Sequence, residues 1–159
     1  MLFLRALFAF LIVPGVVAFL LPLLIAAVDP WRGAVWTPGL VPVLVGAFVL
    51  LWCVRDFYAA GKGTLAPWSP PKKLVTVGLY RLVRNPMYVG VLTLVAGWSL
   101  YFSSFLLGAY ALFLAIRFHM HVRSYEEPWL ASQFGAEWEA YKAAVPRWRP
   151  RLQPWDNGS

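Results

Sequence analysis

The sequence predicts an all-α integral membrane protein with four transmembrane segments, in which the last two form a tight helical hairpin followed by a C-terminal amphipathic helix. Of its 159 residues, 60% are hydrophobic and only 13% are charged, a composition unlike that of a soluble domain. Three long uncharged runs occur along the chain, and basic residues flank them. These observations together indicate helices that cross a bilayer.

The first two uncharged runs, Ala6 to Val28 and Gly33 to Val54, contain 23 and 22 residues and each suits one spanning helix. The first run is longer than the apolar core of a secretory signal and leads into another span, so we interpret it as an uncleaved helix. Pro14 and Pro22 lie within it and predict kinks at helix contacts. Residues 29–38 form the short connection between the two helices.

The third run, Asn85 to Ile116, contains 32 uncharged residues. As one straight helix it would be about 48 Å long, whereas the hydrocarbon core of a bilayer is about 30 Å thick. A break near Ser103 and Ser104 would divide it into two helices joined by a tight turn on the far side of the membrane. The sequence therefore predicts a hairpin and four membrane segments in all.

The placement of charge predicts the orientation, because short cytoplasmic loops carry an excess of Lys and Arg. With four crossings and both termini inside, 13 of the 14 basic residues lie on the cytoplasmic face and only Arg32 lies opposite. The formal charge of +7 then favours anionic lipid headgroups over nucleic acid as the partner. We expect both termini and the active site to be cytoplasmic.

Residues 55–86 are rich in Gly, Pro and basic residues and predict a long interfacial loop. Within it, Gly61-Lys62-Gly63 could let the backbone approach a ligand, although simple flexibility also explains the tripeptide. After the hairpin, Pro128 predicts the first turn of a helix that ends near Val145. The apolar residues of this helix recur at three and four residue spacing and predict an amphipathic helix on the membrane surface: Leu130, Phe134, Trp138, Tyr141 and Val145.

We expect one domain, residues 1–159, with two N-terminal transmembrane helices in 1–54 and the cofactor-binding loop, hairpin and C-terminal helix in 55–159. Cys53 is the only cysteine, so the chain can form no internal disulfide and no metal site from several thiolates. We expect no metal. The sequence leaves the oligomeric state open.

Dense polar sequence brackets the hairpin, with RLVRNPMYVG before it and RSYEEPWLASQFGAEWEAYKAAVPR after it. A chain that only crossed a bilayer would not need this chemistry at both ends of one apolar segment, so the bracketing suggests an enzyme at a membrane surface. Two acids at a helix start, Glu126 and Glu127, could also simply complement the helix dipole, worth about 0.3–1 kcal/mol each. Successive helical positions face different ways, so we expect Glu126 toward a ligand and Glu127 toward Arg123 or solvent.

Residues 72–150 resemble the membrane-embedded S-adenosylmethionine methyltransferases, which include isoprenylcysteine carboxyl methyltransferases and phosphatidylethanolamine N-methyltransferases. The resemblance lies in KLVTVGLYRLVRNPMYVG, then the hairpin, then EEPWLASQFGAEWEAYKAAVPRWRP, in the family's order and spacing. It covers about half the chain. It implies S-adenosyl-L-methionine as cofactor and a lipophilic acceptor that reaches the site from the bilayer.

In that family the cofactor is held by the stretch before and within an Arg-(His/Asn)-Pro-x-Tyr motif and by the first Glu of the pair. By position, the resemblance implies these cofactor-binding residues: Lys73, Leu74, Val75, Tyr80, Asn85, Pro86, Met87, Tyr88 and Glu126. It also implies a substrate contact at Arg123, the nearest match to an arginine close to the methyl acceptor. Among the basic loop residues we expect Arg84 to be a second substrate contact. Asn85 stands where the carboxyl methyltransferases carry His.

The chemistry of the residues agrees with these roles. A sulfonium donor benefits from a carboxylate and aromatic faces, which Glu126, Tyr80 and Tyr88 supply, although both tyrosines could instead belong to an interfacial aromatic belt. A carboxylate acceptor needs only an Arg such as Arg123 to orient it. An amine acceptor must first lose a proton, for which the candidate bases are Glu127, His119 and His121.

We therefore predict an isoprenylcysteine-carboxyl-methyltransferase-like enzyme, with Arg123 and Glu127 as catalytic residues. The alternatives within enzymes are a phospholipid N-methyltransferase and a phenolic-lipid O-methyltransferase. A non-catalytic alternative is a lipid-binding or transporter-associated membrane protein. Transporters usually show internal repeats, and no convincing repeat occurs in this sequence.

Overall fold

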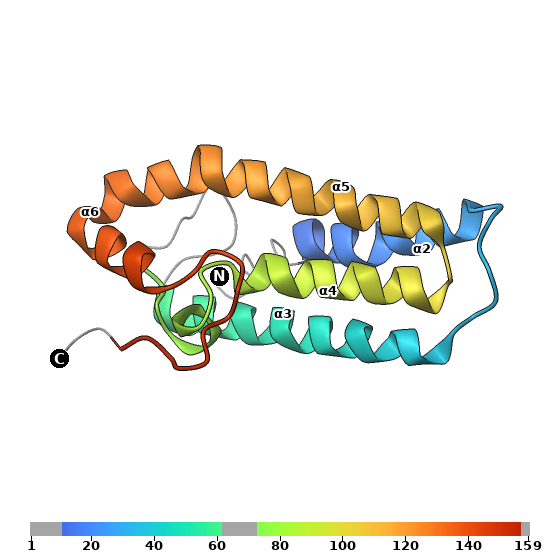
Figure 1. The fold of residues 1–159 in the computed structure, drawn as a ribbon, viewed down its shortest axis with the longest axis horizontal. Helices are drawn as coiled ribbons and strands as arrows, with labels where there is room; N and C mark the ends of the chain where they lie inside the picture. The colour runs from blue at the N-terminus through green and yellow to red at the C-terminus, as the bar shows by residue number, and fades with distance from the viewer. Residues whose placement is uncertain (1–10, 62–72, 157–159) are drawn as a thin grey trace.

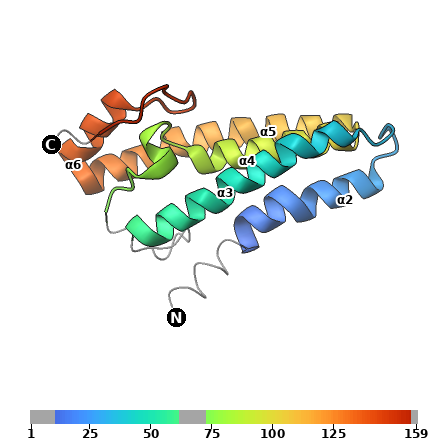
Figure 2. The ribbon, with the colours of Figure 1, turned by 90° about the horizontal axis from the view of Figure 1, so that it is seen from below.

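The computed structural model describes residues 11–61 and 73–156, with side chains for 14–56, 59–60 and 73–156. Over these residues it is helical and contains no strand, as predicted. The long helices lie side by side, and a bent helix with the C-terminal tail covers one end of the bundle (Figures 1 and 2). The elements are a π-helix η1 (Leu11–Leu20), α2 (Leu21–Val28), a 3-10 turn η2 (Thr37–Gly39), α3 (Leu40–Gly61), a 3-10 turn η3 (Gly78–Arg81), α4 (Pro86–Tyr101), α5 (Phe105–His121), a π-helix η4 (Val122–Glu126) and α6 (Glu127–Ala144).

Small residues let α3 and α4 pack backbone against backbone. A Cβ atom at Gly46 would lie 2.6 Å from the carbonyl oxygen of Gly90, and one at Gly97 would lie 2.6 Å from the amide nitrogen of Val43. In membranes, where the hydrophobic effect does not drive helices together, such close approach supplies dispersion contacts. Leu94 is fully buried beside this contact. The α3–α4 pair is thus a rigid support for the residues that follow α3 and precede α4.

The predicted hairpin is confirmed, with α4 and α5 antiparallel and joined by residues 102–104 (Figure 1). Ser103 adopts a left-handed conformation (φ 45°), and the Ser104 hydroxyl caps α5 by accepting the amide of Leu107. The same hydroxyl donates to the buried carboxylate of Asp29. This contact joins the connection after α2 to the hairpin turn.

Two helices, Thr37–Asp56 and the continuous Phe105–Ala144, contain a stretch long and apolar enough to cross a bilayer, and two shorter apolar helices, Pro14–Val28 and Pro86–Tyr101, lie beside them. Large apolar side chains point outward from the long helices, as Leu44 and Leu112 do. This pattern fits contact with lipid. Four crossings with cytoplasmic termini remains our prediction.

The prediction of a loop at residues 55–86 places the start of that loop too early. Helix α3 continues through Asp56 to Gly61, and Gly78–Arg81 form a helical turn. The apolar run ends at Val54, but a helix does not need to end where its apolar side chains do, since polar residues continue it above the membrane. Lys62 and Gly63, the remainder of the glycine tripeptide, lie outside the described residues.

The predicted C-terminal helix is confirmed as α6, but its apolar face is not free to rest on a membrane. Trp138, Tyr141 and Val145 are buried together, and the partly buried Leu74 and Trp155 pack against them. The tail after α6 folds back over this face. The prediction that these apolar side chains rest on the membrane surface is therefore wrong for Trp138, Tyr141 and Val145. The contact instead fastens α6 to the segment that precedes α4.

Candidate functional site

The segment from η3 to the start of α4 is held in place by the tail that follows α6. The two segments are joined by backbone hydrogen bonds. The Arg84 amide donates to the Pro146 carbonyl at 2.9 Å, and the Arg151 amide donates to the Leu82 carbonyl at 2.9 Å. The Asn85 side-chain amide donates to the Arg147 carbonyl at 3.2 Å. These bonds satisfy backbone groups of the irregular residues between η3 and α4. They also fix where Arg84 and Asn85 lie.

Glu126 lies at the centre of the site, at the end of η4. The Tyr88 hydroxyl, on α4, donates a hydrogen bond to Glu126 Oε1 although the residues are 38 positions apart. His121 Nε2 lies 3.3 Å from the same oxygen. The Glu126 side chain remains 30% exposed, so the described residues do not fully enclose it. The polar sequences on the two sides of the hairpin therefore meet, as their bracketing predicted.

Glu127 faces away from Glu126 and joins two arginines. Arg147 donates to both of its oxygens, from Nε at 2.6 Å and Nη2 at 2.7 Å, in the forked geometry that suits a guanidinium and a carboxylate. Arg84 Nη1 lies 3.2 Å from Glu127 Oε1 as an ion pair. The two acids diverge as expected, but the expectation that Glu127 turns to Arg123 or solvent is wrong. Arg147 reaches it because the tail returns to the site.

The two glutamates have opposite pKa shifts. Burial raises the pKa of Glu126, and the hydrogen bond from Tyr88 and the charge of His121 only partly offset it. Burial also tends to raise the pKa of Glu127, but the hydrogen bonds from Arg147 and the charge of Arg84 lower it below its usual value. Glu127 is thus a fixed structural anion, whereas Glu126 is a carboxylate that gains from a cationic ligand.

Arg84 is buried with an incomplete set of partners. Its side chain is 9% exposed and lies over the Trp138 ring at 5.4 Å. Among the described residues, neither its Nε nor its Nη1 makes a hydrogen bond. Burial lowers the pKa of Arg84, and Glu127 counteracts this. One carboxylate with two arginines leaves an excess positive charge, which favours an anionic group nearby.

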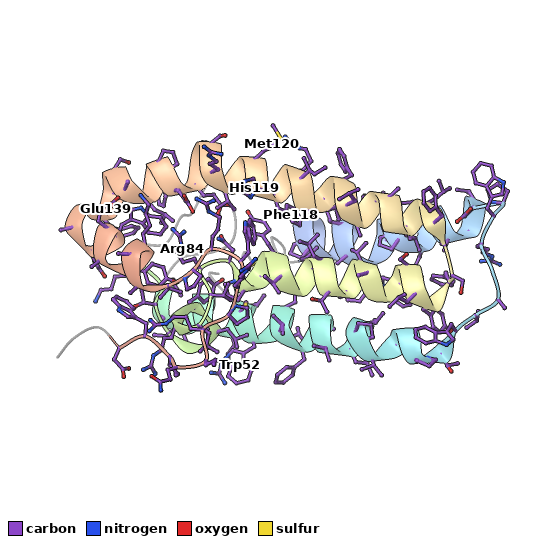
Figure 3. The ribbon with its side chains drawn as sticks, in the orientation of Figure 1. Trp52, Arg84, Phe118, His119, Met120 and Glu139 are labelled. Carbon is purple, nitrogen blue, oxygen red and sulfur yellow. The ribbon has the colours of Figure 1, made fainter. Side chains whose placement is uncertain are left out.

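Two aromatic rings pack beside Tyr88, the residue that bonds to Glu126. The Tyr88 ring lies 4.5 Å from Phe118 and 6.5 Å from Trp148, measured between centroids. Trp148 Nε1 donates to Nδ1 of His119 at 3.2 Å. Figure 3 shows Phe118 and His119 on α5 at the same end of the molecule as Arg84. A carboxylate bordered by aromatic faces is a suitable environment for a methylated cation.

The structure brings most of the predicted cofactor residues to this end. Asn85, Tyr88 and Glu126 make the contacts described above, and most of the others lie beside α3, at the start of α4 or under α6. Val75, Tyr80 and Met87 pack around Cys53 on α3, and Tyr80 is buried with its carbonyl accepting the Tyr141 hydroxyl at 2.6 Å. Pro86 is buried at the start of α4, and Leu74 packs under α6. Lys73 is exposed.

Arg123 is an exposed side chain within η4, and within residues 11–61 and 73–156 no ion pair to Glu126 or Glu127 involves it. Arg84 and Arg147 occupy the position beside the glutamate pair that the sequence suggested for Arg123. Arg147 and Trp148 were not predicted as site residues. The sequence signals for them were a basic and aromatic tail directly after Pro146 and its inclusion in the last motif of the resemblance, which assigned these two residues no role.

The simplest structural explanation of the glutamate pair does not fit. A helix dipole acts on acids at a free N-terminus, but α5 continues through η4 into α6, whose helical backbone is interrupted only at Gly135. Glu126 has helical backbone angles and no capping bond. Pro128 lacks the N–H that would bond to the carbonyl of Ser124, and the π-helical turn lies directly before it. The π-turn thereby directs Glu126 toward Tyr88 and Glu127 toward Arg84.

A comparison with protein-family models matches residues 36–137 to a family described as phospholipid methyltransferase. The matched span is more than half of the chain. It begins before α3, includes η3, the hairpin and both glutamates, and ends within α6. No curated protein and no solved structure matched the chain. The tail residues 145–156, which complete the site, lie beyond the matched span.

Proposed function

We propose a reaction and its place from the family: the chain belongs to the phospholipid methyltransferase family and is therefore a membrane-embedded methyltransferase. The protein would transfer a methyl group from S-adenosylmethionine to a lipophilic acceptor. The transfer would take place at the end of the bundle that carries Glu126. The observation that carries this proposal is the contact between Tyr88 and Glu126. It joins the two motifs that flank the hairpin into one polar site at the edge of an apolar bundle.

The residues present fit this cofactor. Its sulfonium and amino groups are cationic, and Glu126 is a partly exposed carboxylate whose pKa is raised by burial, so a cation would favour its ionised form. The ring of Tyr88, which bonds to that carboxylate, packs beside Phe118 and Trp148. The bound cofactor would supply an activated methyl group. Glu126 and Tyr88 would hold its charged end, and Tyr80, Val75, Leu74, Lys73, Asn85, Pro86 and Met87 remain the proposed contacts for the rest.

The protein's own contribution is mainly positioning. Methyl transfer requires the donor, the methyl carbon and the acceptor atom in line, and holding them so can supply about 7–11 kcal/mol of the barrier reduction. The Tyr88 hydroxyl fixes one oxygen of Glu126, and the Arg147 fork fixes Glu127 one residue later. These contacts fix the two glutamates from α4 and from the tail after α6.

The acceptor is proposed to carry an anionic group that Arg84 binds, since Arg84 is buried and has nitrogen atoms without hydrogen bonds to the described residues. A lipid carboxylate, as in isoprenylcysteine carboxyl methyltransferases, meets this need and is already nucleophilic. A phospholipid meets it through its phosphate, and the family description favours this second candidate. For an amine acceptor the proposed bases are His121 and His119. Glu127 is a poor proton acceptor because two arginines lower its pKa. Arg123 remains a proposed contact at the exposed rim.

The test is transfer of a labelled methyl group into lipids by membranes that contain the protein, compared with the Glu126→Ala variant. Label in extracted lipid, absent with the variant, is expected. Mild base then separates the acceptors, because methyl esters lose the label and N-methyl amines keep it. Lipid that gains no label in the presence of S-adenosylmethionine and a full lipid extract would contradict the proposal.

A further inference from the structure

Two buried polar atoms on α3, one of a carboxylate and one of an indole, have no hydrogen bond to any described residue. The Asp56 side chain is 5% exposed; its Oδ1 accepts from Arg55, but its Oδ2 makes no bond. One turn earlier, the indole N–H of Trp52 is also buried and unpaired. Neither residue belongs to the motifs on either side of the hairpin. Figure 3 shows Trp52 at the end of the bundle where the site lies.

Both groups border the same glycine. A Cβ atom at Gly78 would lie 1.9 Å from Asp56 Oδ2 and 3.1 Å from Trp52 Nε1. Gly78 also has a φ of +54°, a conformation that glycine adopts without strain. An acceptor and a donor therefore face one small region beside the backbone that leads into η3. Any residue larger than glycine would clash with the Asp56 carboxylate there.

Leaving these groups unpaired is unfavourable. A buried polar group without a partner costs about 1–3 kcal/mol, and more for a charged one. Arg55 offsets little of this cost, because its side chain is 73% exposed and its charge is screened by solvent. Unpaired buried groups in a native protein usually indicate a bound molecule or an ordered water. The chemistry of the two atoms restricts which molecule fits.

The required ligand must donate to a carboxylate oxygen and accept from an indole N–H. An ammonium group only donates and would leave Trp52 unpaired, whereas a phosphate only accepts and would be repelled by Asp56. A hydroxyl group does both. From this juxtaposition we propose that Asp56 and Trp52 bind a ribose hydroxyl of the nucleoside part of the methyl donor. This inference rests on the proposed function.

The location suits that part of the donor. Cys53, one turn before Asp56, packs with Val75 and Tyr80 of the segment proposed to contact the cofactor. Met87 packs against the same cluster, and the next residue, Tyr88, donates its hydroxyl to Glu126. A donor whose charged end lies at Glu126 would extend past Tyr80 to place its ribose near Asp56.

The experiment pairs protein variants with cofactor variants. Purified full-length protein in lipid nanodiscs is titrated calorimetrically with S-adenosylmethionine and with its 2′-deoxy and 3′-deoxy forms. The wild type should lose affinity by about 10- to 100-fold when the bound hydroxyl is removed, because the carboxylate and the N–H are left unpaired. Asp56→Asn should bind the complete cofactor more weakly by a similar factor and no longer discriminate. Trp52→Phe should reduce the discrimination by a smaller factor.

Trp138→Phe is the matched control, since it removes another buried indole N–H that lacks a partner, on α6 instead of α3. It should retain the full discrimination between the cofactor forms. Variants at Asp56 and Trp52 that still discriminate like the wild type would overturn the inference, as would a fall in melting temperature alone or an increase in the acceptor KM alone. If Asp56→Asn does not fold, Trp52→Phe decides. A wild type that binds no S-adenosylmethionine would contradict the proposed function itself.

Discussion

Arg147 connects the tail to the site through Glu127, and its substitution tests this contact directly. Arg147→Met keeps an unbranched side chain but removes two hydrogen bonds of 2.6 and 2.7 Å to Glu127, which is only 11% exposed. Breaking a buried ion pair costs about 3–5 kcal/mol, but Arg84 still partners Glu127 and Arg147 is itself 27% exposed. We therefore expect the free energy of unfolding to fall by about 2 kcal/mol, a value between those typical of surface ion pairs and of buried ion pairs.

The assay is a double-mutant cycle with Glu127→Gln, measured by reversible unfolding in mixed micelles. The coupling energy between the two positions should be about 1–2 kcal/mol, since residues in one hydrogen-bonded network are not additive. Arg149→Met, two residues further along an exposed part of the same tail, is the control and should change stability by less than about 0.5 kcal/mol. A coupling energy indistinguishable from zero, with Arg147→Met no worse than Arg149→Met, would refute the reasoning.

Four further predictions concern single groups. Tyr88→Phe removes the hydroxyl that holds Glu126, and calorimetry should show S-adenosylmethionine binding weakened by about 5- to 10-fold, corresponding to one hydrogen bond; unchanged affinity would argue against this positioning role. Because the pKa of Glu126 is raised, cofactor affinity should increase as pH rises through that pKa and then level off, and Glu126→Gln should abolish the trend. Because the folded-state pKa of Glu127 is lowered, its pairing should contribute stability above the unfolded pKa of about 4.3 and lose it as pH falls through the folded value; acid unfolding of Glu127→Gln should lack this component. Finally, Gly135→Ala, at a residue with φ 49°, should lower stability by about 1–2 kcal/mol through backbone strain alone, since its Cβ would meet nothing within 4 Å; a neutral effect in thermal unfolding would contradict it.

The sequence predicts the parts of this molecule that depend on local pattern. The uncharged run from Asn85 to Ile116 was too long for one crossing, and its division at Ser103 and Ser104 is the turn that the structure shows. The three and four residue spacing of apolar positions likewise identified α6 and its buried face. These features follow from helix geometry and bilayer thickness, which act on every chain alike.

The parts that could not be predicted depend on contacts between distant segments. Arg147 and Trp148 enter the site because the tail pairs its backbone with residues 82–84, and no local pattern encodes such pairing. Arg123 seemed a better partner for the glutamate pair because it is nearer in sequence. A π-helical turn shifts the side-chain directions that an ideal helix would have, and this turn separates Arg123 from Glu127.

Cofactor binding by the Glu126→Ala variant is the most direct test of the central claim. The measurement is calorimetric titration of S-adenosylmethionine into the wild type and the variant in nanodiscs, with unfolding curves to verify that both are folded. Since Glu126 lies where Tyr88 and His121 converge, the folded variant should show no measurable binding under conditions that saturate the wild type. A folded Glu126→Ala variant that binds with wild-type affinity would contradict the claim that the two motifs beside the hairpin form one cofactor site.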